Sequence, residues 1–167
     1  DPGQLHTLQN ADGNAVALTP QLLEHPDFDS AIYLLDLEAL FALEGMVSVH
    51  VEAGRQRQNA ATVKENARSE RRWLVVDCGD TRLALDVDAV REVATCGTVA
   101  PPVIDLPAYL GNVALRGATL PLFDPRALIG QPARQTPPSH LTVLDSNHGR
   151  VALAVDRVAT LTGSDQP

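Results

Sequence analysis

Short apolar runs alternate with polar turns along much of this chain. Three segments share one pattern, in which an apolar run, a polar turn and a second apolar run follow in order: residues 5–23, 73–93 and 141–161. Asp, Asn or Gly stands at the turn of each segment, and these residues readily take the backbone conformations of tight turns. We therefore predict three β-hairpins.

A second unit occurs twice, as a short apolar run, an aspartate and a few residues that favour a helix. It reads IYLLDLEALF at residues 32–41 and LPLFDPRALI at residues 120–129. Asp36 and Asp124 stand where a side chain caps the first N–H groups of a helix, and Pro125 follows at a position that needs no N–H. We predict that both aspartates cap helices and that neither is catalytic.

The length of 167 residues predicts one domain with a sizeable core. Residues 45–72 read as a linker or an exposed helix, because the apolar face over 59–71 is thin. Long amphipathic crossover helices are missing, which argues against a parallel α/β fold. The many short strands predict an all-β barrel or paired barrels.

Composition argues against several classes of protein. Aromatic residues make up 4% of the chain, so the predicted core is aliphatic, and the net charge of −8 argues against nucleic-acid binding. No apolar run reaches the roughly 18 residues of a membrane span, so no membrane insertion is expected. Two cysteines, Cys78 and Cys96, are too few for a disulfide framework. Cys78 reads as a buried free thiol, and a reducing, cytoplasmic location is the simplest interpretation.

Motifs that carry catalysis are missing from the sequence. The five histidines have no metal-ligand spacing, and no nucleophile elbow, phosphate-binding loop or dinucleotide fingerprint occurs. The carboxylates stand at turns and helix starts rather than in pairs. We predict no catalytic residue, no metal and no cofactor, while a small-ligand binder on a β-barrel stays an open alternative.

The sharpest surface feature lies within residues 111–130. Arg116 and Gly117 form a turn between two apolar runs, and an arginine at a hairpin corner is not easily buried. A solvated arginine is the favoured reading from composition alone, and a partner-binding arginine is the alternative. Arg126 offsets the charge of the capping Asp124, and Tyr109 is expected to pack.

Residues 73–161 resemble the CheW-like domain family of bacterial chemotaxis. The family pattern has a helix ending in V-x-E-V, matched at 90–93, and then a hallmark G-V-I-N-L-R-G-x-x-V-P-V-I-D-L-R, matched at 111–126. A closing hairpin of the type G-x-x-x-x-L-x-V-D-x-V is matched at 149–158. The order and spacing agree across most of the segment.

The resemblance implies two small five-stranded SH3-like barrels that share an aliphatic core, with short helices. It implies a non-catalytic adaptor that couples the regulatory domain of a CheA-like histidine kinase to the cytoplasmic tip of a chemoreceptor. The partner-binding residues it implies are Arg116, Gly117, Leu115, Val113 and Arg126. A guanidinium suits this role because it offers a planar fork of donors.

Asn112, Ala114 and Pro125 depart from the family pattern. They motivate a second hypothesis, an array-localisation or polar-positioning protein that uses the same module for other partners.

Residues 1–44 resemble the closing segment of a CheW-like domain, and the body of the domain covers 73–167. The segment is expected to complete this domain in permuted order, to be exchanged in a domain-swapped homodimer, or to belong to a preceding domain. Burial favours completion, because a body without it would expose apolar strand edges.

Overall fold

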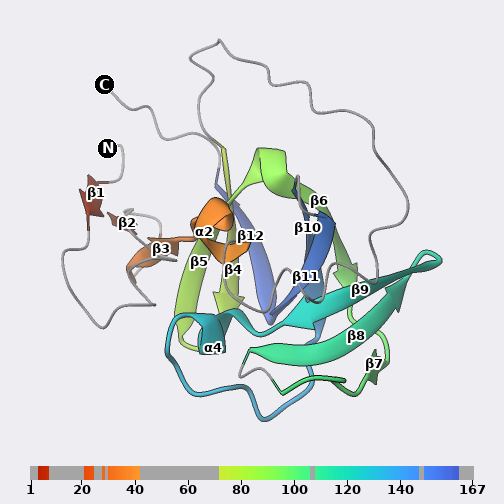
Figure 1. The fold of residues 1–167 in the computed structure, drawn as a ribbon. Helices are drawn as coiled ribbons and strands as arrows, with labels where there is room; N and C mark the ends of the chain where they lie inside the picture. Colours follow the sequence, from red (N-terminus) through yellow and green to blue (C-terminus); the bar gives the residue numbers. More distant parts are fainter. Residues whose placement is uncertain are drawn as a thin grey trace.

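The computed structural model describes residues 4–7, 21–24, 28, 30–41, 72–105, 108–146 and 149–161, most of which lie in β-strands (Figure 1). The first sheet has the order β1-β2-β3-β5-β4-β12 and consists of β1 (Gln4–Thr7), β2 (Gln21–Glu24), β3 (Ile32–Leu34), β5 (Thr81–Asp86), β4 (Trp73–Cys78) and β12 (Arg157–Leu161). The second has the order β6-β10-β11-β9-β8-β7 and consists of β6 (Val90–Thr95), β10 (His140–Ser146), β11 (Gly149–Val155), β9 (Ala118–Phe123), β8 (Tyr109–Leu115) and β7 (Val99–Ala100). The predicted all-β class is confirmed, with six strands in each sheet where five were expected.

The two sheets are built alike. Both contain one parallel pair, β3 with β5 in the first sheet and β9 with β11 in the second, and all other neighbours are antiparallel. Strands β1 to β5 take the same places in the first sheet as β7 to β11 take in the second. The remaining strand is exchanged, because β6 joins the second sheet and β12 joins the first.

The chain therefore passes from one sheet to the other at the end of two hairpins. The 3-10 turn η1 (Val87–Ala89) leads from β5 to β6, and its first residue donates a backbone hydrogen bond to the carbonyl of Arg72 at 3.1 Å. Asp156 lies between β11 and β12, and its N–H donates to the Asp77 carbonyl at 2.8 Å. Both crossings are thus fastened to the two ends of β4.

Residues 90–93 form a strand, which corrects the helix expected there. Val90 to Thr95 alternate between half-buried and exposed positions, the period of a strand with one face on the protein. The strand pairs with β10, where Val93 stands opposite Thr142 and Glu92 opposite Val143. The two valines are β-branched and favour a strand. A helix at this position would also leave one edge of β10 unpaired.

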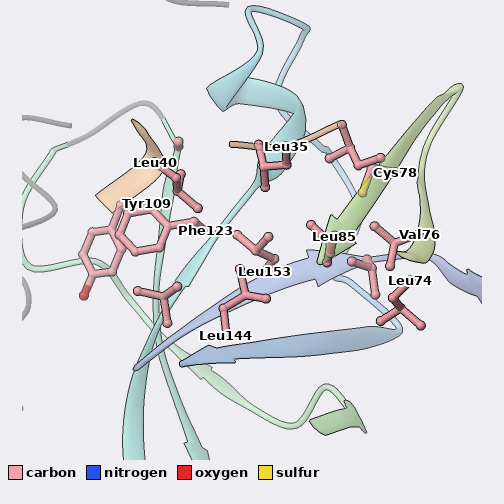
Figure 2. Packing of buried hydrophobic residues seen from close by; sticks show 14 residues of the cluster. Leu35, Leu40, Leu74, Val76, Cys78, Leu85, Tyr109, Phe123, Leu144 and Leu153 are labelled. Carbon is pink, nitrogen blue, oxygen red and sulfur yellow. The ribbon is translucent and has the colours of Figure 1, made fainter. Parts of the chain in front are cut away.

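The core is aliphatic, as predicted, and lies between the sheets. Figure 2 shows the largest buried cluster, with side chains from both sheets and from the segment around α2 (Leu37–Phe41). Two rings belong to it, Tyr109 and Phe123, whose centroids are 5.5 Å apart. Tyr109 thus packs, as expected. Each fully buried leucine contributes about 1.5–3 kcal/mol of transfer free energy.

Both predicted helix caps are confirmed. Asp36 precedes α2 (Leu37–Phe41), and its Oδ1 accepts a hydrogen bond from the Ala39 N–H at 3.1 Å. Asp124 precedes α4 (Pro125–Leu128), and its Oδ1 accepts from the Arg126 N–H at 3.1 Å. Each capping aspartate follows a strand of a parallel pair, so the two strand–Asp–helix units hold equivalent places in the two sheets.

In the hairpin predicted over residues 5–23, β1 and β2 pair antiparallel. The turn between them lies outside the described residues. The same holds for residues 45–71 of the linker or exposed helix expected at 45–72.

Candidate interaction site at the β8–β9 hairpin

The β8–β9 hairpin ends in the tight turn that the sequence predicts. Leu115 pairs with Ala118, which leaves Arg116 and Gly117 as a two-residue loop. Their φ angles are 48° and 78°, and two successive positive φ angles are the mark of a type I′ turn. Arg116 is the only non-glycine residue with a positive φ in the described part of the chain.

The Arg116 side chain bridges the hairpin to β6. Its Nε donates a hydrogen bond to Oε2 of Glu92 at 2.9 Å, and the side chains are 78% and 25% exposed respectively. An exposed pair of this kind contributes about 0–1 kcal/mol to stability. The Nη groups carry four further donors. The geometry therefore gives the guanidinium an orientation without burying it.

The apolar residues predicted around Arg116 differ in exposure. Val113 is 1% exposed and belongs to a core cluster of the second sheet, and Leu115 is half-buried against that cluster. Gly117 is exposed. The two apolar side chains anchor the hairpin in the second sheet, while the turn itself is presented to solvent.

Arg126 lies elsewhere. The turn that carries Arg116 precedes β9, and the helix that carries Arg126 follows it, so the two arginines stand at opposite ends of one strand (Figure 1). The Arg126 guanidinium packs against Gly79, where a Cβ would lie 3.0 Å from its Cζ. Its Nε is buried and has no hydrogen-bond acceptor in the described part of the protein. The structure does not bring Arg126 and Arg116 together.

Sequence reasoning missed a charged cluster next to Arg126, which we call the Arg134 cluster: Asp124, Arg134 and Asp156. The Arg134 side chain is 4% exposed, and its Nη1 donates to Oδ1 of Asp156 at 3.1 Å. The Arg134 N–H donates to Oδ2 of the fully buried Asp124 at 2.8 Å, and the guanidinium Nε lies 3.8 Å from Oδ1.

The Arg134 cluster fastens the loop after α4 to a crossing between the sheets. Asp156, which stands at the crossing, also accepts a hydrogen bond from the Gly79 N–H at 2.7 Å. Thr81 adds a hydrogen bond to Gln131 at 2.6 Å, which holds the start of the same loop on β5. The capping role of Asp124 was the one signal of this cluster in the sequence, because nothing local distinguishes a buried arginine in a Pro-containing loop.

Cys78 is the buried free thiol that the sequence predicts. Its side chain is fully buried, and burial, followed by the nearby Asp156 carboxylate, raises the pKa of the thiol to about 12. Burial also raises the pKa of the half-buried Cys96. Neither thiol is poised as a thiolate nucleophile near neutral pH.

Neither a cluster of metal-ligating side chains nor a membrane-spanning helix occurs among the described residues. These residues contain no group of three or more His, Cys, Asp or Glu side chains placed to hold a metal ion. They also contain no helix with the length and apolar character needed to cross a bilayer.

The fold and the hairpin define a class of protein: a β-rich domain of two interlocked sheets that presents an oriented arginine on a tight turn. A sequence profile of the CheW-like domain matches residues 72–165. The chain belongs to the CheW-like domain family, whose members are non-catalytic scaffold domains of chemotaxis.

Two relatives illustrate the similarity. The chemotaxis protein CheW of Rhizobium meliloti (strain 1021) is 38% identical over 91 residues, which are 53% of this chain and 58% of that protein. The match thus covers less than two thirds of that relative. The crystal structure of the scaffolding protein TtCheW from Thermoanaerobacter tengcongensis superposes with a TM-score of 0.53 at 20% identity, over 59% of this chain and 68% of that one. The second comparison shows the fold.

Proposed function

We propose that this domain is a cytoplasmic chemotaxis adaptor that couples the regulatory domain of a CheA-like histidine kinase to the cytoplasmic tip of a chemoreceptor. Family membership supports the scaffold role. The observation that carries the finer proposal is Arg116, a 78% exposed guanidinium held in one orientation at the corner of the family's hallmark hairpin. Such an arginine binds carboxylates or carbonyls of a partner with little further ordering.

Four of the five predicted binding residues belong to one hairpin in this proposal. Arg116 contacts the partner, while Val113 and Leu115 fix the hairpin that carries it. Gly117 completes the turn. Arg126 is proposed to act at a separate contact, since it stands at the other end of β9.

The first test is a calorimetric titration with the regulatory domain of a CheA kinase from the same bacterium. Arg116→Glu should weaken binding at least about tenfold, as expected for an arginine hot spot. The melting temperature should change little, because the pair with Glu92 is exposed. Arg157→Glu is the matched control, since Arg157 is exposed on β12 in the other sheet.

A charge swap separates partner binding from the internal ion pair. In the double variant Arg116→Glu with Glu92→Arg, the ion pair is rebuilt with its charges reversed. Binding should stay weak if the guanidinium contacts the kinase. Full recovery would show that only the ion pair matters, and unweakened binding in the single variant would refute the assigned contact.

The polar-positioning alternative makes a different prediction. Ala114, which departs from the family pattern, is exposed on β8 beside the hairpin, so a different side chain is offered there. A domain that binds neither a CheA regulatory domain nor a receptor tip, but binds a polar-positioning protein, would replace the coupling proposal with this one.

A further inference from the structure

The edge of β5 and the core beside it form a docking surface within the body of the domain, of which residues 73–105, 108–146 and 149–161 are described. We propose that residues 21–24, 28 and 30–41 of the same chain are the permanent occupant of this surface, and that they close the first sheet as β8, β9 and α4 close the second. The inference concerns the assembly of the domain and does not depend on which partner the domain binds.

Backbone pairing is the first support. β3 runs parallel to β5, with Ile32 opposite Arg82 and Leu34 opposite Ala84. The pairing continues past the strand, because the Leu35 N–H donates to the Ala84 carbonyl at 3.0 Å. Without this segment the inner strand β5 would become an open, apolar edge.

Burial is the second support. Leu35 and Leu40 are 4% and 0% exposed and belong to the largest core cluster, together with side chains of both sheets (Figure 2). Ile32 and Leu34 pack with Val75 and Ala84 in a smaller cluster. The segment therefore supplies core to the body rather than lying on its surface.

Charge and aromatic contact add to the pairing. The guanidinium of Arg82, on β5, lies 4.9 Å from the centroid of the Phe28 ring. Arg82 also donates from its Nε to Oδ1 of Asp77 at 2.8 Å, so the cation is held in place for this contact.

The equivalence of the two sheets is the strongest support. β2, β3 and α2 have the same order, directions and capping aspartate in the first sheet as β8, β9 and α4 have in the second. The second set is part of the matched CheW-like region, whereas the first set precedes it. The family profile is matched in sequence order over residues 72–165. A closing segment that comes earlier in the chain therefore lies outside the match.

The decisive experiment cuts the connection. A specific protease site is inserted between residues 56 and 57 of the full chain, and the cut protein is analysed by size-exclusion chromatography with light scattering. We expect the two fragments to elute together with the mass of one chain and to separate only in denaturant. Separation under native conditions would overturn the proposal.

A disulfide distinguishes closure within one chain from exchange between two. Leu34→Cys and Ala84→Cys stand opposite each other in the β3–β5 pair and are placed in a background of Cys78→Ala and Cys96→Ser. Oxidation should give a cross-linked monomer on a non-reducing gel. A covalent dimer would show that the segment is exchanged between copies and would overturn closure within the chain.

A matched pair of substitutions on α2 tests the burial directly in the cut protein. Leu40→Asp places a charge in the core and should release the N-terminal fragment, whereas Glu38→Lys, on the exposed side of the same helix, should leave the fragments together. Retention of the fragment by Leu40→Asp would contradict the docking described above.

Discussion

Removing the guanidinium of Arg134 should destabilise the fold by about 2–3 kcal/mol. Arg134→Met keeps an unbranched apolar stem and deletes the guanidinium contacts with Asp124 and Asp156. Breaking a fully buried ion pair typically costs about 3–5 kcal/mol. The expected value is lower for two reasons, since Asp124 keeps two backbone N–H donors and Asp156 is 41% exposed.

Urea unfolding measures this loss, with the fluorescence of Trp73 as the signal, because the chain has one tryptophan. With a slope of about 2 kcal/mol per molar urea, the midpoint should fall by about 1–1.5 M. Arg91→Met is the matched control, since it breaks a pair with Asp145 that is almost half exposed on both sides. It should cost less than about 1 kcal/mol.

An unchanged or raised midpoint for Arg134→Met would refute the reasoning. The Nε and Nη2 atoms of Arg134 are buried without a hydrogen-bond acceptor in the described part of the protein. Their desolvation penalty works against the ion pair. A stable variant would show that the desolvation penalty of the guanidinium exceeds the stabilisation from its ion pairs.

Two further predictions concern the interior. Cys78 titrates near pH 9.0 when unfolded and at about 12 in the fold, so the unfolded state loses its proton first and stability falls as the pH rises above 9. The loss of stability should reach about 1.4 kcal/mol at pH 10. Urea midpoints at pH 8 and pH 10 measure it, and Cys78→Ala should lack this part of the pH dependence. An equal change of midpoint in both proteins would contradict the assignment. Gly111→Ala should cost about 3 kcal/mol or more, because its Cβ would lie 1.9 Å from the Ala100 oxygen, whereas Gly117→Ala, with open space and a φ of 78°, should cost only about 1–2 kcal/mol. Equal thermal shifts for the two variants would show that the close approach of β7 to β8 is not rigid.

Local patterns gave most of the elements. Alternation and turn residues located the hairpins, and the aspartates at 36 and 124 located two helix starts, because these signals act within a few residues. The helix expected at 90–93 came from the family resemblance, and it is wrong because pairing with the distant β10 makes this segment a strand.

The contacts of the site could be foreseen only in part. The turn chemistry of Arg116 and Gly117 follows from the sequence, since a two-residue loop between apolar runs requires positive φ angles. The ion pair with Glu92 does not, because it joins residues on strands that are not neighbours in the sheet. Arg134 is buried for the same reason: its partners come from the start of α4 and from a crossing between sheets.

The two crossings of the chain also limit how the sheets can move. One lies at Val87, hydrogen-bonded to Arg72, and the other at Asp156, hydrogen-bonded to Asp77. These anchors are five residues apart on an extended stretch of chain, a separation of about 17 Å. Two bodies joined at two separate points cannot rotate freely about either one. The two crossings therefore hold the first sheet at a set distance and angle from the second.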